Sequence, residues 1–158
     1  MRNIRELSIG SIVWVCQPDS TELLCEVCGL GEKILKKTVK KIVKVKVLKS
    51  SIDDPDVIGT TRTYHIGRIN AHEIMVHILK AIGFVESDER SWKLMYYCGD
   101  MRLYWKYDVR KRYSTFKFKP DFTQKQWVRI ECRHIHKLQN IMRFLTDGEM
   151  EFKYNNNA

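Results

Sequence analysis

Hydrophobic and polar residues alternate along much of the first 67 residues, as they do in strands that bury one face. The clearest example is KKIVKVKVLK at residues 40–49, where valines alternate with lysines. Glycine, proline or acidic turns separate several β-branched runs of this kind. These runs predict strands at residues 9–15, 21–30, 34–49 and 62–67, with a connector at 50–61. The pattern predicts a small, strongly bent antiparallel sheet or β-barrel.

The pattern changes to helical spacing near residue 70. Asn70 and Glu73 have the spacing of a capping box, apolar residues recur at three- and four-residue intervals, and Gly83 supplies a stop. A second helical pattern covers residues 133–145. Two helices are therefore expected, one over about 70–83 and one at the C-terminal end.

Four strand-like runs lie between the two expected helices. They cover residues 91–98, 101–109, 113–120 and 126–132, and a short strand is also expected within 149–154. In YSTFKFK, Tyr113, Thr115 and Lys117 alternate with Ser114, Phe116 and Phe118, which predicts one wet face.

The predicted fold class is α+β: an N-terminal small β-barrel or sheet, a helix, an antiparallel β region and a C-terminal helix. The expected organisation is a small β sub-domain over residues 1–67, an α+β sub-domain over 68–154 and a flexible tail at 155–158, forming one compact unit.

Composition narrows the class of protein. The chain has 158 residues and no apolar run long enough for a membrane span, which takes about 18 residues. The N-terminal residues do not have the apolar region of a signal peptide, so a cytoplasmic protein is expected. Five cysteines without an export signal are expected to be reduced thiols.

The net charge of +9 is distributed unevenly. Residues 1–50 carry ten basic and five acidic side chains, a net of +5, whereas residues 51–90 carry four and seven, a net of −3. Residues 91–158 carry fourteen and seven, a net of +7. Two basic segments therefore flank an acidic one, which favours nucleic acid, nucleotides or an acidic protein as the partner.

Three segments carry a resemblance to a known family. They are LSIGSIV at 7–13, INAHEIMVHILKAIGF at 69–84 and HIHKLQNIMRFLTDGEMEF at 134–152. In this order they resemble a family of small uncharacterised proteins from gut anaerobic bacteria, their mobile elements and their phages, with an early IGN-V strand and a final HQLQN…LTG-E helix. The matching positions of that helix are His136, Leu138, Gln139, Asn140, Leu145, Thr146, Gly148 and Glu149.

Two departures from that pattern are Lys137 in place of the usual glutamine and an extra Asp147 before the glycine. The motifs of the family are structural, so the resemblance implies no catalytic residue. It implies a genomic setting, that of a phage or mobile-element accessory protein in the cytoplasm of its bacterial host.

Metal binding and catalysis receive little support. Cys25 and Cys28 have the spacing of half a zinc site, and a second half would have to come from Cys132, His134 and His136. In a strand, however, Cys25 and Cys28 point to opposite faces, which favours packing roles and no metal. No nucleophile motif and no glycine-rich phosphate loop occurs, so we expect a protein that is not an enzyme and uses no cofactor.

The strongest functional signal is RLYWKYDVRKRYSTFKFK at residues 102–119, with seven basic and six aromatic side chains. Single-stranded nucleic acid binders combine a cationic groove with rings on which bases stack, and nucleotide sites use the same groups. Aromatic residues are also favoured in strands, so a packed strand with solvated cations remains the alternative. The lysines of residues 40–49 likewise fit the solvated face of a strand, which also protects a sheet edge.

The sequence thus predicts non-catalytic binding of an anionic partner, with nucleic acid favoured. The alternatives are an anti-defence protein that sequesters a nucleotide signal or blocks a host immune effector, and a structural virion or assembly component. The candidate contact residues are Lys40, Lys44, Lys46, Arg102, Trp105, Lys106, Arg110, Lys111, Arg112, Tyr113 and Lys117.

Overall fold

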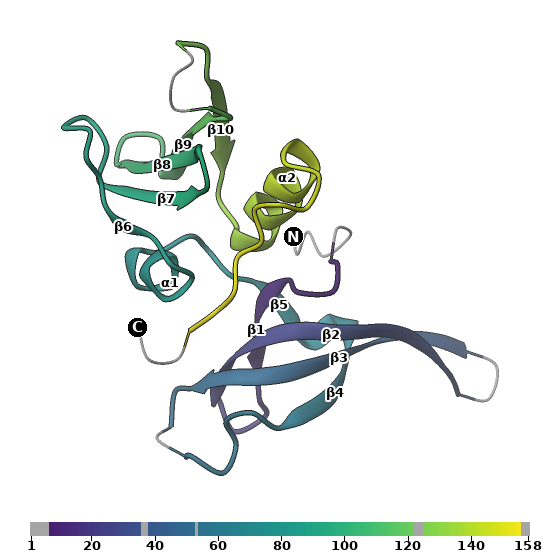
Figure 1. Ribbon diagram of the computed structural model, residues 1–158. Coiled ribbons are helices and arrows are strands. Elements are labelled where there is room, and N and C mark those ends of the chain that lie inside the picture. Colours follow the sequence, from purple (N-terminus) through teal and green to yellow (C-terminus); the bar gives the residue numbers. More distant parts are fainter. Residues whose placement is uncertain (1–6, 36–37, 53, 122–124, 156–158) are drawn as a thin grey trace. The chain divides into compact units, whose positions relative to one another are not determined.

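The computed structural model describes residues 7–35, 38–52, 54–121 and 125–155 of the chain (Figure 1). Over these residues the fold is mixed, with ten strands in two antiparallel sheets and two α-helices. The chain divides into two units, one ending at His72 and one starting at Glu73. This division falls five residues after the expected 67/68 boundary, because one further strand pairs with the first sheet.

The first unit contains a five-stranded sheet with the order β4-β3-β2-β1-β5. Its strands are β1 (Ile12–Cys16), β2 (Glu22–Leu35), β3 (Thr38–Ser50), β4 (Thr61–His65) and β5 (Ile69–Ala71). A short 3-10 helix, η1 (Ile66–Arg68), joins the last two strands. Because β4 and β5 are the two edges of an open sheet, the barrel alternative is wrong for the described residues.

The inner face of this sheet forms the core of the first unit. Val43, Val45 and Val47 of β3 are buried in it, while Lys44 and Lys46 between them are exposed. The core cluster comprises Val13, Val15, Leu23, Cys25, Val27, Val43, Val45, Val47 and Ile69. The predicted two-faced character of β3 is therefore confirmed, and it follows from burial of the valine face.

The strands β2 and β3 continue past their neighbours as a two-stranded ribbon (Figure 1). In this ribbon Ile34 pairs with Val39 and both are exposed. Two irregularities in the register, between Leu24 and Cys25 and between Val27 and Gly29, interrupt β2 before the ribbon. Such bulges increase local twist and bend the strand.

The helix expected at residues 70–83 is wrong in its first half. Residues Ile69–Ala71 form β5, and the helix α1 covers only Val76–Ala81. Met75, in an extended conformation, is its N-cap and makes no side-chain capping bond, so the Asn70–Glu73 capping box does not form. Pairing of β5 with β1 and stacking of the His72 ring on Trp14, with centroids 4.9 Å apart, favour the extended path.

The second unit contains a sheet with the order β10-β9-β8-β7-β6. Its strands are β6 (Val85–Glu86), β7 (Leu94–Cys98), β8 (Met101–Asp108), β9 (Tyr113–Lys119) and β10 (Val128–Cys132). The four longer strands match the four predicted runs, and β6 was not predicted. The C-terminal helix α2 (Ile135–Leu145) confirms the second predicted helix.

One face of this second sheet is the core of the unit. Leu94, Trp105, Phe116 and Ile130 lie side by side across four strands and are all buried. Phe84 packs on Phe116 and on Phe152, with ring centroids 6.4 Å and 5.9 Å apart. Phe152 belongs to the segment expected to form a short strand, which instead packs on the core without strand pairing.

Of the predicted tail, Asn155 donates its backbone N–H to the carbonyl of Ala81, and residues 156–158 lie outside the described part. Lys36 and Lys37 of the lysine-rich segment also lie outside it.

Candidate nucleic-acid interface

The predicted contact residues are divided between the two units. Lys40, Lys44 and Lys46 lie on the outer face of β3 in the first unit and are exposed. The cross-strand neighbours of Lys44 are Gly29 and Thr63, which offer no aromatic ring. Lys44 therefore has no ring directly beside it, and the cross-strand neighbour of Lys46 is the acid Glu26, whereas the basic-aromatic residues all belong to the second unit.

The turn between β8 and β9 displays three of the predicted cations. Arg110, Lys111 and Arg112 are all exposed there. The Oδ1 atom of Asp108 accepts the backbone N–H groups of Arg110 and Lys111, at 3.0 and 3.1 Å. Aspartate in this position orders a turn through its own side chain. The Asp108 side chain thus fixes the conformation of the hairpin tip, whose three cationic side chains are exposed to solvent.

Arg112 occupies the left-handed region of the backbone, with φ of 53°. This conformation is uncommon for a residue with a Cβ atom. It closes the turn so that Tyr113 can start β9 opposite Asp108.

A shallow hollow of about 490 Å³ lies on one side of the hairpin tip. Its lining residues are Arg90, Ser91, Trp92, Lys93, Lys106, Tyr107 and Val109. Three of the seven are cations, two are aromatic and none is acidic. This lining combines the two groups that single-stranded nucleic acid requires, positive charge and rings.

Within the hollow, Trp92 and Tyr107 differ in what their rings already contact. The Lys106 ammonium lies 4.7 Å from the Trp92 ring centroid, and the Lys117 ammonium lies 5.2 Å from it. Cation–π attraction of this kind holds an ammonium over a ring. Tyr107 is 48% exposed, so its ring is the one presented to solvent. Trp92 therefore positions Lys106, and Tyr107 offers the stacking surface.

A second hollow, of about 340 Å³, lies on the other side of the tip. Lys111, Arg112, Tyr113, Glu131, Cys132 and Arg133 line it. Its acid is already engaged, because Glu131 accepts the Tyr113 hydroxyl at 2.8 Å and pairs with Arg129 at 2.6 Å. The hydrogen bond from Tyr113 lowers the pKa of Glu131. The consecutive residues 107–113 join the two hollows into one cationic surface, which we call the tip surface.

Two of the predicted contact residues are not accessible. Trp105 is 2% exposed and packs in the core between Leu94 and Phe116. Lys117 is 7% exposed, because the loop 87–93 folds over it. The predicted wet face of β9 is therefore wrong, because Thr115 and Lys117 on that face are both buried, and neither Trp105 nor Lys117 reaches a partner molecule.

The loop 87–93 is tied to the sheet by charge. Glu89 accepts the ammonium groups of Lys117 and Lys119, the latter at 2.8 Å. Lys117 also lies 4.6 Å from the ring centroid of Tyr104. Burial raises the pKa of Tyr104 to about 12, and a hydrogen bond to Asp88 adds to the rise. The acids of this loop thus neutralise Lys117 and Lys119. They do not pair with the cations of the hairpin tip.

Arg102 lies at the opposite end of β8 from the tip. Its Nη1 atom donates to the carbonyls of Gly99 and Met101, at 2.7 and 3.0 Å, and its guanidinium lies over the Tyr97 ring. It therefore belongs to the β7–β8 turn and is not part of the tip surface.

Sequence reasoning missed several residues that line the tip surface, among them the ring of Tyr107 and the cations Arg90, Lys93 and Arg133. Tyr107 lay inside the tract that was singled out, and its position directly before the turn was the available signal. The other three lie outside that tract, and only the packing of neighbouring segments brings them to the tip.

Cys25 and Cys28, which have the spacing of half a zinc site, lie in different environments on β2. Cys25 is buried in the core and Cys28 is exposed at the bulge of β2. Burial raises the pKa of the Cys25 thiol to about 12. Within the described ranges, no three His, Cys, Asp or Glu side chains gather as metal ligands do.

No protein-family model, no curated protein and no solved structure matches the chain. The family resemblance and the genomic setting it implies therefore stay expectations. Among the described residues, neither helix has the length and apolar character that crossing a membrane requires.

Proposed function

We propose that this protein binds single-stranded nucleic acid without catalysis, through the tip surface of its second unit. The setting proposed for this activity is that of a phage or mobile-element accessory protein, on the strength of the family resemblance. The observation that carries the binding proposal is the ordered hairpin tip, whose three exposed cations lie between two hollows lined by further cations and rings.

The charge of the tip surface supports this proposal. Arg90, Lys93 and Lys106 line one hollow and Arg133 the other. The single acid in the two linings, Glu131, is held by Tyr113 and Arg129. Phosphate contacts by such cations release counterions and provide affinity that depends little on sequence.

The exposed ring of Tyr107 supports a single strand over a duplex. An unpaired base can stack on an aromatic ring with a contribution of about 1–3 kcal/mol, and stacking tolerates any base. A duplex keeps its base faces inside the helix and would use only the cations of the tip surface. We therefore expect tighter binding of single strands than of duplexes of the same sequence.

The test is fluorescence anisotropy with a labelled thymine oligonucleotide between about 50 and 200 mM salt. The variant Arg110→Gln/Lys111→Gln/Arg112→Gln removes three cations of the tip. If all three contact phosphate, the slope of log affinity against log salt becomes less steep by about two. Binding that does not change with salt would contradict the proposal.

A matched control removes the same charge elsewhere in the second unit. Lys80→Gln/Lys125→Gln/Lys153→Gln also deletes three exposed lysines, none of which lines either hollow. This variant should retain most of the affinity and the salt slope. Equal losses in both triple variants would indicate that net charge, and not the tip surface, determines binding.

The size of the first hollow favours a second candidate, sequestration of a single nucleotide. Pockets for small molecules have volumes of about 300–1,000 Å³, and this hollow has about 490 Å³. A nucleotide binder gains thermal stability with one small ligand and not with others. A shift with a mononucleotide and none with the oligonucleotide would select this candidate. No shift with either would leave an acidic host protein or an assembly role.

A further inference from the structure

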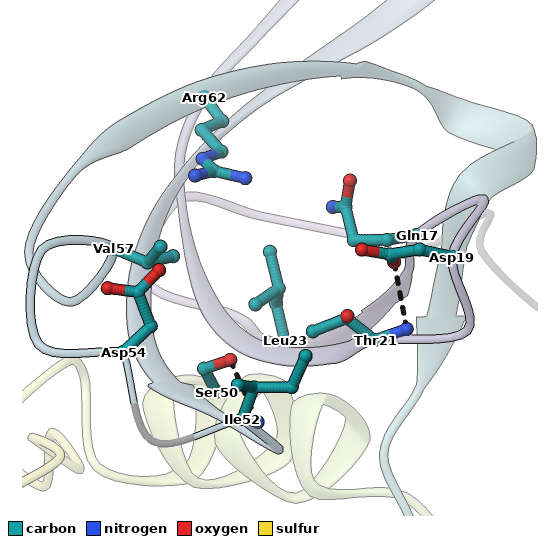
Figure 2. A pocket seen from close by; sticks show the side chains of 9 residues that line it. All are labelled: Gln17, Asp19, Thr21, Leu23, Ser50, Ile52, Asp54, Val57 and Arg62. Atoms are coloured by element: carbon teal, nitrogen blue, oxygen red, sulfur yellow. Dashed lines mark hydrogen bonds between the residues drawn. The ribbon is translucent and has the colours of Figure 1, made fainter.

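A separate polar cavity lies in the first unit, where the turn after β1, the end of β3 and the described part of the loop 51–60 meet (Figure 2). Its volume is about 240 Å³. The lining residues are Gln17, Asp19, Thr21, Leu23, Ser50, Ile52, Asp54, Val57 and Arg62. None of them belongs to the tip surface or to the candidate contacts of the sequence analysis.

Arg62 is the unusual member of this lining. In β4 it lies opposite Val45, on the core side of the sheet, whereas Thr61 and Thr63 face outward. Within the described parts of the chain, no hydrogen bond or ion pair engages its guanidinium. Figure 2 shows this guanidinium pointing into the cavity. A half-buried arginine without a partner leaves five donors free for a ligand.

Two carboxylates face the same space from different segments (Figure 2). Asp54 is half-buried, and its Oδ1 accepts the backbone N–H of Asp56 at 3.1 Å. Asp19 is exposed, and its Oδ1 accepts the N–H of Thr21 at 3.0 Å. These bonds fix each aspartate in a turn while a second carboxylate oxygen remains. The cavity therefore offers one positive and two negative groups.

The floor of the cavity is apolar and rigid. Leu23 belongs to the buried core cluster, and Val57 packs against that cluster. The loop is fastened to the sheet by backbone bonds from Ser51 to Glu22 and from Gly59 to Val47, at 2.9 and 2.8 Å. A site supported by packed strands in this way holds its groups in place before a ligand arrives.

We propose that this cavity binds a small zwitterion of the α-amino-acid type. Arg62 takes the carboxylate, which a guanidinium can grip with two parallel bonds. Asp54 takes the ammonium group, because its burial strengthens the attraction relative to exposed Asp19. Leu23 and Val57 contact the apolar side chain. A simple anion would face two carboxylates and a simple cation would face Arg62, so a molecule with both charges matches this lining best.

The volume agrees with this ligand class. At about 30 Å³ for each water in the liquid, the cavity equals roughly eight waters. That is the number of non-hydrogen atoms in an amino acid such as valine. The cavity has about half the volume of the first hollow of the tip surface, which favours a ligand smaller than a nucleotide.

The experiment is a thermal-shift screen of the full chain with the common L-amino acids at about 10 mM each, followed by calorimetric titration of those that bind. A bound amino acid should raise the melting temperature by about 3 °C or more. The N-acetyl derivative, which lacks the cation, and the amide, which lacks the carboxylate, should each bind about tenfold to a hundredfold more weakly.

Arg62→Gln should abolish the shift, and Arg68→Gln, an exposed arginine outside the cavity lining, should retain it. If Arg62→Gln fails to fold, Asp54→Asn provides the second test. This variant should no longer bind the free amino acid more tightly than its N-acetyl derivative. The proposal is overturned if no amino acid stabilises the chain, if Arg62→Gln binds as the parent does, or if the N-acetyl derivative binds equally well. The first of these results would leave Arg62 as an inward charge that protects an edge strand.

Discussion

Glu89 and Lys117 form an ion pair beneath Trp92, and this pair joins the loop 87–93 to the centre of β9. The Lys117 side chain is almost completely buried, and Glu89 is partly exposed. Two rings, those of Trp92 and Tyr104, enclose the ammonium group. The pair therefore has a structural role, and it places Arg90, Trp92 and Lys93 around the first hollow.

Replacing Glu89 by glutamine should lower the free energy of unfolding by about 1–3 kcal/mol. The substitution leaves the buried Lys117 charge uncompensated, which costs more than the loss of an exposed pair. Urea denaturation measures the effect. The matched control is Glu86→Gln, whose ion pair with Lys80 is exposed and should contribute less than about 1 kcal/mol. Equal effects in the two variants would contradict a structural role for the Glu89 pair.

The contribution of Glu89 should depend on pH. Burial alone would raise the pKa of the Glu89 carboxyl, but hydrogen bonds from Lys117 and Lys119 outweigh it and lower the pKa below the usual 4.5. A carboxyl with a depressed pKa in the folded state stabilises the fold above its unfolded-state pKa, and this stabilisation is lost as pH falls through the folded-state pKa. The stability difference between the parent and Glu89→Gln should be constant from pH 7 to about 5.5 and shrink below about 4.5. A difference that grows on acidification would show that another group is responsible.

Tyr107 and Trp105 should behave oppositely in the oligonucleotide assay. Tyr107→Ala removes the exposed ring and should weaken binding about fivefold to a hundredfold, the equivalent of one lost stacking contact. Trp105→Phe should leave the affinity unchanged, because Trp105 is buried in the core. Anisotropy titrations at one fixed salt concentration test both variants. A large loss of affinity in Trp105→Phe, with unchanged melting temperature, would contradict the burial argument.

Gly83 should be the more sensitive of two matched glycines. Both Gly83 and Gly99 have positive φ, at 106° and 56°. A Cβ atom at Gly83 would lie 3.0 Å from the Tyr96 ring, whereas one at Gly99 would have open space. Gly83→Ala should therefore lower stability by about 1–3 kcal/mol and by more than Gly99→Ala. Thermal denaturation of the two variants distinguishes steric contact from backbone strain alone.

Local sequence predicted most strands and the C-terminal helix, because each has a strong period. The valine–lysine alternation of β3 and the apolar spacing of α2 specify which face is buried wherever these elements pack. The same reasoning was wrong at residues 70–75. There the capping signal of Asn70 and Glu73 was overridden by pairing of β5 with β1, a contact between segments more than fifty residues apart.

The candidate site was only partly visible from the sequence. The cations of the hairpin tip were predicted because they form a run beside turn residues. Trp105 and Lys117 were included with them, because composition does not distinguish a buried ring or an ion-paired lysine from an exposed one. Arg90, Lys93 and Arg133 reach the tip surface through loop and strand packing, which no local pattern contains.

By itself, the sequence determined the charge distribution, the two-faced character of β3 and the position of the β8–β9 turn, since these depend on neighbouring residues. The tertiary structure alone decided that the first sheet stays open, that Lys117 is covered by Glu89 and Trp92, and that Arg62 faces a cavity lined by two aspartates. These outcomes depend on contacts between residues far apart in the chain. Such contacts form only where buried surface and paired charges outweigh local preference.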